Sequence, residues 1–158
     1  MSRRGSAMPE ERLDHEVKQS VFIRAPREKV YDAFATAEGL DRWFTRGSRV
    51  DARPGGAMVL KWVDWGAEQG INAEVPGRVI EAKRPERFVY EWGEPGSEST
   101  VEIILEKRDD GTLVRLREFG FRKIENLIDN AGGWGEALTL AKVWVEHGIA
   151  TNQPKARV

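Results

Sequence analysis

The sequence feature that most constrains the fold is a long amphipathic segment near the C-terminus, residues 132–148. At about 100° of rotation per residue, its apolar side chains fall within half of a helical wheel. These apolar residues, with one position just beyond the segment, are Trp134, Ala137, Leu138, Leu140, Ala141, Trp144, Val145 and Ile149. The apolar arc is wider than the seam between two helices requires. The pattern therefore predicts one long helix lying across a broad apolar surface such as a sheet.

Alternating segments ahead of this helix predict antiparallel strands. In residues 16–25, the side chains of Val17, Gln19, Val21 and Ile23 share one face, as in a strand with one buried side. Further strands are predicted at residues 58–62, 77–82, 88–92, 101–106 and 112–121. Turns rich in proline, glycine or aspartate separate them at 53–56, 84–86, 93–96 and 109–111. We expect consecutive hairpins, a polar loop at residues 65–73 and a linker of about ten residues before the long helix.

Two short helices are predicted between the first strand and the first turn. Pro26 suits the first position of a helix, and apolar side chains recur at helical spacing from Val30 until Gly39. Residues 39–44 predict the second short helix. The order of strand, two short helices, antiparallel strands and one long helix predicts an α+β fold, with the long helix packed on a bent sheet.

Length and composition indicate one domain. A chain of 158 residues, 40% of them hydrophobic, can bury a core without metal or disulfide crosslinks. Residues 1–14 are charged and nearly devoid of large apolar side chains, so we expect a flexible N-terminal tail. We expect the domain at residues 15–150 and a second tail at residues 151–158.

Charge and composition narrow the classes of partner. The 25 basic and 26 acidic side chains leave no field that would concentrate nucleic acid or anionic lipid, so we expect no nucleic-acid partner. No stretch is apolar for long enough to span a bilayer, and the N-terminus lacks the apolar region of a secretion signal. The absence of cysteine fits a reducing compartment. We therefore expect a cytoplasmic protein that does not insert into membranes.

Five segments occur in an order typical of a known superfamily. They are APREKVYDAF followed by LDRWF, PGG before a strand, RPERFVYEW, a strand ending in EFGF, and GGW with Leu138 four residues on. Over residues 17–149 the chain resembles the START-like, or SRPBCC, superfamily, and within it the branch named for the activator of the heat-shock-protein-ninety ATPase. The resemblance implies a helix-grip fold, in which a strongly curved antiparallel sheet wraps the C-terminal helix. It also implies an elongated cavity for a small apolar molecule.

The chain departs from the pattern of this branch at one place, and members of the superfamily have several different functions. In this branch the strand before the long helix often carries Thr-His, where this chain has Arg117 and Glu118. No role of that histidine is therefore transferred. Members of the superfamily include ligand carriers, cyclases and aromatase-like proteins, and co-chaperone domains.

Glu118 is the best candidate for a catalytic residue. It shares a strand face with Val114 and Leu116, which is expected to point toward the helix. An apolar pocket disfavours the charged form of a carboxyl group, which is the condition for a general acid or base or for holding a polar group of a ligand. The alternative is that the strand has ended and Glu118 meets solvent or pairs with Arg117 or Arg122.

Inward-facing aromatic and aliphatic side chains are the candidates for a binding site. Packing alone explains many of them, because aromatic side chains dominate protein cores. Pockets are also mostly apolar, with a few polar groups that fix orientation. The predicted ligand-binding residues are Gln19, Trp43, Met58, Leu60, Trp62, Tyr90, Trp92, Leu116, Glu118, Phe121, Trp134, Leu138 and Ala141. Trp65, between the predicted strands, either closes a cavity mouth or lies exposed in the loop.

Other residue patterns give no catalytic or metal-binding motif. His15 and His147 are far apart in sequence, and no metal-ligand spacing occurs, so we expect no metal and no cofactor. No serine lies in a G-x-S-x-G setting. The glycine-rich run at residues 132–135 lacks the lysine of a phosphate loop, and we expect it to let Trp134 and the helix start pack closely against the sheet.

Three functions remain open on the sequence. The first is binding of a small hydrophobic or aromatic ligand between the sheet and the C-terminal helix, without assigned catalysis. The second is a chaperone-associated interaction domain, as the name of the family branch implies. The third is an enzyme of the cyclase or dehydratase kind that uses Glu118 with a pocket residue such as Tyr90. The sequence does not indicate the oligomeric state.

Overall fold

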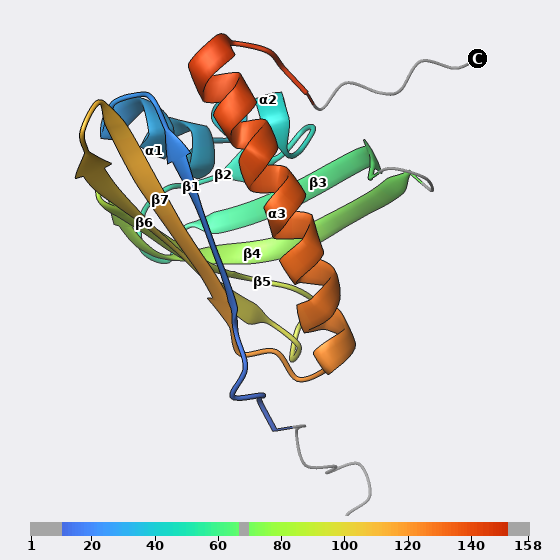
Figure 1. Ribbon diagram of the computed structural model, residues 1–158. Helices are drawn as coiled ribbons and strands as arrows, with labels where there is room; N and C mark the ends of the chain where they lie inside the picture. The colour runs from blue at the N-terminus through green and yellow to red at the C-terminus, as the bar shows by residue number, and fades with distance from the viewer. Residues whose placement is uncertain (1–10, 67–69, 152–158) are drawn as a thin grey trace, which may run out of the picture.

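The computed structural model describes residues 11–66 and 70–151. Its elements follow the predicted order of strand, two short helices, antiparallel strands and one long helix (Figure 1). The elements are β1 (Val17–Ile23), α1 (Arg27–Ala35), α2 (Ala37–Trp43), β2 (Arg49–Val50), β3 (Ala57–Trp65), β4 (Ile71–Lys83), β5 (Arg87–Trp92), β6 (Ser99–Arg108), β7 (Gly111–Phe119) and α3 (Ile124–His147).

The described strands form a seven-stranded antiparallel sheet in the order β1-β7-β6-β5-β4-β3-β2. The first strand therefore pairs with the last, with Val17 opposite Glu118 and Ile23 opposite Thr112. The sheet curves around α3, and α1 and α2 lie near the C-terminal end of that helix (Figure 1). This arrangement confirms the α+β helix-grip fold.

Irregular pairing helps the sheet to bend. The register shifts between Trp62 and Trp65 where β3 pairs with β4, and between Val79 and Glu81 where β4 pairs with β5. An extra residue in one strand increases the local twist and bends that strand. The bend carries the far ends of β3 and β4 toward the first half of α3, and this is the region in which the candidate site lies.

The apolar face of α3 forms one side of the core. Trp134, Ala137, Leu138, Ala141 and Val145 are buried against the sheet, as the helical pattern predicts. Leu140 and Trp144 are only partly buried at the edge of this face. Ile149 is 56% exposed and lies beyond the end of α3, so its assignment to the apolar face was wrong. Gly148 ends the helix in a left-handed conformation, which turns Ile149 away from the sheet.

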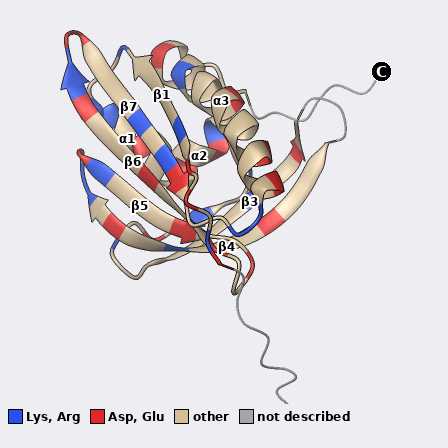
Figure 2. Ribbon diagram, turned by 60° about the horizontal axis from the view of Figure 1, so that its bottom comes forward, with Lys and Arg blue, Asp and Glu red and all other residues tan. Residues whose placement is uncertain are grey.

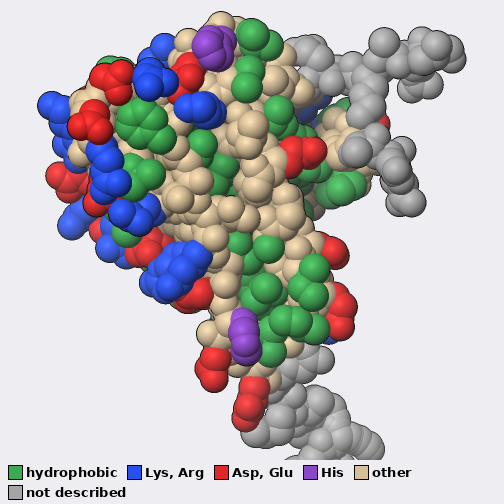
Figure 3. Space-filling model, viewed as in Figure 1, with side chains coloured by type: hydrophobic (Ala, Val, Ile, Leu, Met, Phe, Trp, Pro, Cys, Tyr) green, Lys and Arg blue, Asp and Glu red, His purple; other side chains and the backbone are tan. Residues whose placement is uncertain are grey.

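The predicted linker before the long helix was wrong, because α3 begins at Ile124 and includes the glycines at 132, 133 and 135. Glycine, asparagine and aspartate weaken the helical signal of this segment. Ile124 and Ile128 are 44% and 61% exposed, so apolar side chains also occur on its solvent side. Figure 3 shows hydrophobic side chains gathered at this end of the molecule. The first turns of α3 therefore lack a clean amphipathic pattern.

The predicted polar loop at residues 65–73 was also largely wrong. Strand β3 continues to Trp65 and β4 begins at Ile71, and these two residues are paired. Residues 67–69 lie outside the described part of the chain. Paired strands satisfy backbone hydrogen bonds whatever their side chains, so polar residues here extend the hairpin instead of ending it. The two short helices are confirmed, but the boundary between them lies at Thr36 instead of Gly39, and the Thr36 hydroxyl caps the second helix by accepting from the backbone N–H of Gly39.

The ends of the chain fall partly outside the described residues. Of the predicted N-terminal tail, residues 1–10 are not described, and neither are residues 152–158 of the C-terminal tail. The backbone N–H of Leu13 donates to the carbonyl oxygen of Phe121, and Arg12 donates to that of Gly120. This part of the predicted tail therefore contacts the segment that follows β7.

Acidic and basic residues alternate along β5, β6 and β7 (Figure 2), and several of them form ion pairs between neighbouring strands. Glu102 on β6 accepts from Arg87 on β5 and from Arg117 on β7, so Arg117 binds across the sheet surface.

Each helix in the described part of the chain is too short or too polar to cross a membrane.

Candidate functional site

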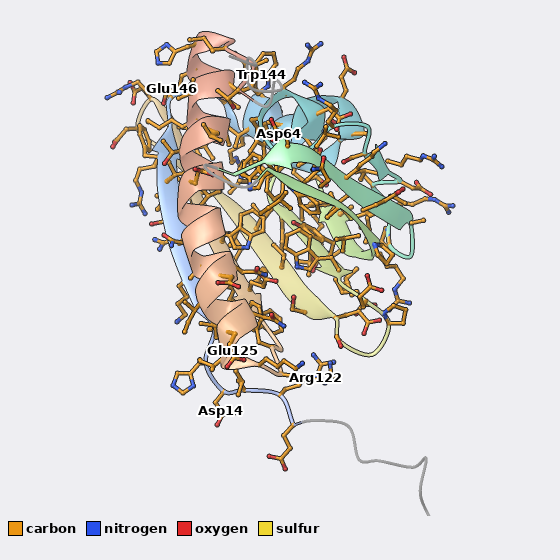
Figure 4. The ribbon with its side chains drawn as sticks, turned by 90° about the vertical axis from the view of Figure 1, so that its right-hand side faces the viewer. Asp14, Asp64, Arg122, Glu125, Trp144 and Glu146 are labelled. Atoms are coloured by element: carbon orange, nitrogen blue, oxygen red, sulfur yellow. The ribbon has the colours of Figure 1, made fainter. Side chains whose placement is uncertain are left out.

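A pocket of about 560 Å³ lies between the first half of α3 and the ends of β3, β4 and β5. Figure 4 faces this side of the molecule, with Arg122 and Glu125 marking the end of α3 nearest the pocket. The lining combines a continuous aromatic surface with a polar rim. The lining residues are Phe44, Trp62, Trp65, Ile71, Ala73, Val75, Trp92, Gly93, Glu94, Ser97, Ser99, Phe121, Asn126, Asp129, Asn130, Gly133 and Trp134.

The aromatic walls are in mutual contact. Phe44, at the end of α2, packs edge-on against Trp62 and Trp65, with ring centroids 5.2 and 5.4 Å apart. Its ring also lies 5.3 Å from that of Trp134. Trp92 on β5 lies 5.7 Å from Trp134 with an angle of 33° between the ring planes. Sheet, short helix and long helix thus contribute to one aromatic surface, which suits a flat apolar ligand.

A buried carboxylate beneath the pocket accepts hydrogen bonds from two of the lining tryptophans. Glu118 on β7 has 0% exposure and does not line the pocket. The indole nitrogens of Trp92 and Trp134 donate to it over 2.7 and 2.8 Å. The hydroxyl of Ser99 donates over 2.5 Å, and the side-chain amide of Asn130 lies 3.2 Å from both carboxylate oxygens. Glu118 on β7 therefore connects β5, β6 and α3 beneath the pocket. The alternative prediction, that Glu118 is exposed to solvent, was wrong.

Tyr90 lies beside this carboxylate and is also buried. Burial raises the pKa of the Tyr90 phenol well above its usual value of 10.0, and the negative charge of Glu118 adds to the rise. The phenol therefore keeps its proton at neutral pH. The ring packs edge-on against Trp92, with centroids 5.7 Å apart. Tyr90 and Glu118 thus sit behind the aromatic wall, where a ligand in the pocket would not touch them.

The polar rim comes from α3 and from the turn after β5. Asn126, Asp129 and Asn130 recur at helical spacing and face the pocket from one side. Glu94 and Ser97 face it from the turn. The pocket therefore has an aromatic interior and an acidic, amide-bearing mouth.

The structure brings together only part of the predicted ligand-binding set. Trp62, Trp92, Phe121 and Trp134 line the pocket. The other aliphatic and aromatic members belong to the buried core behind or beyond it: Trp43, Met58, Leu60, Tyr90, Leu116, Leu138 and Ala141. Gln19 donates to the carbonyl oxygen of Ala131 and so ties β1 to α3 instead of lining the pocket. The indole nitrogen of Trp43 donates to the carbonyl oxygen of Ala33 within the core.

Sequence reasoning missed several lining residues. Phe44 was assigned to a short helix without a role, although its apolar side chain at a helix end was a usable signal. Ile71, Ala73 and Val75 alternate as a strand should, but the surrounding glycine and polar residues hid that pattern. Trp65 lines the pocket, in agreement with the first of its two predicted positions. Asn126, Asp129 and Asn130 of α3 were missed because their segment was assigned to a linker.

The glycines at the centre of α3 and the distribution of potential metal ligands bear on two further predictions. Gly132 and Gly133 lie within α3, and a Cβ added at either would meet no atom within 4 Å. The expectation of close packing against the sheet was therefore wrong for Gly132 and Gly133, whereas a Cβ at Gly135 would lie 3.7 Å from Nε2 of Gln19 on β1. Among residues 11–66 and 70–151, no three His, Cys, Asp or Glu side chains gather as a metal site would require.

Comparisons with known proteins give a family match. The sequence model of the family described as activator of Hsp90 ATPase homolog 1-like protein matches residues 24–144. This range contains most of the segments on which the sequence resemblance rests. The search among curated proteins gave no match.

Several solved structures share the fold. DynU16, a putative protein in the dynemicin biosynthetic locus, superposes with a TM-score of 0.76 at 17% identity, over 89% of this chain and 51% of that one. The chain therefore spans about half of DynU16. Aha1 from Colwellia psychrerythraea, solved as a dimer, gives 0.71 at 18% identity, over 85% and 98% of the two chains. Protein CV1439 from Chromobacterium violaceum gives 0.71 at 24%, over 84% and 98%. At these identities the likeness concerns the fold.

Proposed function

The chain belongs to the activator of Hsp90 ATPase homolog 1-like family within the START-like superfamily, and we propose that it binds a small flat aromatic molecule beside the first half of α3. The observation that carries this proposal is the pocket of about 560 Å³ with six aromatic side chains in its lining, from Phe44 to Trp134. Ligand pockets in proteins commonly measure about 300–1,000 Å³ and are mostly apolar with a few polar groups. Both properties match.

The proposed site occupies only part of the elongated cavity that the family resemblance implies. Beneath the second half of α3, the side chains of Leu138, Ala141 and Val145 are 2% exposed or less and belong to the core. Close-packed interiors leave little room for a ligand. The ligand is therefore expected at the open end of the sheet, between α3 and the ends of β3, β4 and β5.

We propose binding without catalysis by Glu118. A general acid or base must come within hydrogen-bonding distance of the reacting group. Glu118 accepts from Trp92, Ser99, Asn130 and Trp134, which separate it from the pocket. Its role in this proposal is to position the indoles of the two tryptophans. Catalysis by Glu118 with Tyr90 would require the aromatic wall to move aside.

Calorimetric titration with 1-naphthalenemethanol, a neutral two-ring probe, tests the proposal. We expect saturable binding at one site per chain. Ala73 lines the pocket from β4, so Ala73→Trp should fill it and abolish binding, while the smaller change Ala73→Leu should weaken binding. Ile80 on the same strand is 42% exposed and outside the lining, so Ile80→Trp is the matched control and should bind normally. Unaltered binding by a folded Ala73→Trp variant would contradict the proposed site.

The chaperone-associated role stays a prediction from the family resemblance. It concerns a partner surface, whereas the pocket concerns a small molecule, so the two can be tested separately. Stimulation of the ATPase activity of a heat-shock-protein-ninety chaperone by the wild-type protein, unchanged in Ala73→Trp, would favour this role. Absence of any stimulation would remove it.

A further inference from the structure

We propose that the pocket prefers aromatic molecules that carry a positively charged amine and discriminates against aromatic carboxylates. This inference rests on the proposed function, because it concerns the ligand of the same pocket. It follows from three features of the lining: the charges at the mouth, the direction of the hydrogen-bond donors, and the faces of the aromatic rings.

The charges at the mouth are acidic. Glu94, in the turn after β5, and Asp129, on α3, both belong to the lining. Among the described residues that line the pocket there is no lysine, arginine or histidine. Arg122 and Lys123 follow directly on Phe121 in the chain, yet neither is part of the lining. A carboxylate entering here would meet like charges, and an ammonium group would meet opposite ones.

The donors of the pocket are largely directed away from it. The indole N–H groups of Trp92 and Trp134 and the hydroxyl of Ser99 all donate to Glu118. The amide nitrogen of Asn130 also faces Glu118, and this leaves its carbonyl oxygen as the acceptor. Four of the potential side-chain donors for a ligand carboxylate are thus already used, and the amide of Asn126 and the hydroxyl of Ser97 are the other uncharged side-chain donors of the rim. An ammonium group, which only donates, would be served by the acceptors that remain.

The aromatic lining favours the same sign of charge. Aromatic rings carry partial negative charge on their faces, and tryptophan attracts cations most strongly among the aromatic side chains. Four tryptophans line the pocket: Trp62, Trp65, Trp92 and Trp134. Glu118 lies directly behind two of them and adds a further negative charge on the same side. The acidic mouth, the donors held by Glu118 and the tryptophan-rich lining therefore each favour a cation over an anion.

Three naphthalene derivatives of similar size test the inference by calorimetric titration at neutral pH and low salt. They are 1-naphthylmethylamine, which is cationic, 1-naphthalenemethanol, which is neutral, and 1-naphthoate, which is anionic. We expect the amine to bind about tenfold or more tightly than the carboxylate, with the alcohol between them. The ratio should shrink as salt is added, since exposed charges are screened.

Outcomes for the wild-type protein separate this inference from the proposed function. Binding of the alcohol together with equal affinity for the two charged compounds would overturn the charge preference and leave the proposed function standing. Tighter binding of the carboxylate would overturn it as well. Absence of binding by all three compounds would contradict the proposed function, and the charge preference with it.

Charge-neutralising variants identify the groups responsible. In the double variant Asp129→Asn and Glu94→Gln, the amine-to-carboxylate ratio should fall severalfold while the affinity for the alcohol is retained. Glu136→Gln is the matched control, because Glu136 is exposed on the same helix and lies outside the lining. An unchanged ratio in the double variant would overturn the assignment of the preference to the acidic mouth.

Discussion

The indole nitrogen of Trp134, on α3, donates to Oε1 of Glu118, on β7, over 2.8 Å. Trp92 donates to the other carboxylate oxygen from β5. A single buried carboxylate thus fixes one indole on the helix and one on the sheet, and the two rings lie 5.7 Å apart. The width of the pocket at this point depends on Glu118, although Glu118 does not line the pocket.

Glu118→Gln should destabilise the protein by about 1–3 kcal/mol, because the new amide N–H₂ group faces donors that have no other acceptor nearby. Glu118→Ala should cost about 3 kcal/mol or more, since it also leaves a cavity. Urea unfolding followed by tryptophan fluorescence measures both. Glu74→Gln on the exposed side of β4 is the control, with an expected change within about 0.5 kcal/mol. Equal stability of Glu118→Gln and the wild-type protein would show that these hydrogen bonds contribute little.

Ala141→Trp should destabilise the protein by about 3 kcal/mol or prevent folding, because overpacking a filled interior forces side chains and backbone to shift. Ala141 has 0% exposure, lies in the second half of α3 and is outside the pocket. Ala73→Trp, which projects into open space, should change the stability by no more than about 1 kcal/mol. Thermal unfolding of the two variants compares them directly. Equal destabilisation would mean that the pocket is as closely packed as the core.

The fold could be predicted from the sequence because its periodic segments are strong. Val114, Leu116 and Glu118 alternate on β7, so the inward position of the glutamate follows from the strand alone. The pairing of β1 with β7 is not a local property of either segment, and it was not predicted from the sequence. Strand alternation alone thus predicts which side chains of β7 face the core, whereas the pairing of β7 with β1 has to be learned from the structure.

Most of the pocket could not be predicted in the same way. Asn126, Asp129 and Asn130 lie in a segment with low helix propensity, and α3 begins after Lys123 without a capping side chain. The helix forms there because its later turns are anchored on the sheet, a tertiary effect that no local pattern records. Leu60 and Trp62 share one strand face and both belong to the buried core, yet only Trp62 also lines the pocket. Whether an inward-facing residue of the sheet can contact a ligand depends on its distance from the side chains of α3 that face it.

Gly132→Ala should stabilise the protein by about 0.5–1 kcal/mol. An alanine loses less backbone entropy on folding, and its Cβ would meet no atom within 4 Å. Gly39→Ala is the opposite case, since its Cβ would lie 2.2 Å from the carbonyl oxygen of Asp32. That variant should lose about 2 kcal/mol or more. Urea unfolding of both variants tests the pair, and destabilisation by Gly132→Ala would contradict the open environment of this glycine.

Glu146, in the last turns of α3, connects the helix to the end of β1. Its Oε2 accepts from Nζ of Lys142 and from the backbone N–H of Arg24, each over 2.7 Å. Lys142 also donates to the carbonyl oxygen of Phe22. The hydrogen bond from Lys142, followed by that from Arg24, holds the pKa of the Glu146 carboxyl below its usual value of 4.5.

A carboxyl group whose pKa is lower in the folded than in the unfolded state stabilises the protein above the unfolded pKa, and this contribution is lost as the pH falls through the folded pKa. Glu146→Gln should therefore reduce the free energy of unfolding by about 1 kcal/mol near neutral pH. The difference should begin to shrink as the pH falls below the usual value of 4.5, and it should vanish only below the lowered folded pKa, where the carboxyl of the folded wild-type protein is protonated too. Urea unfolding across this range measures the difference, with Glu136→Gln, at an exposed position on the same helix, as the control. A constant deficit of Glu146→Gln at all pH values would mean that side-chain packing, not charge, makes this contact stabilising.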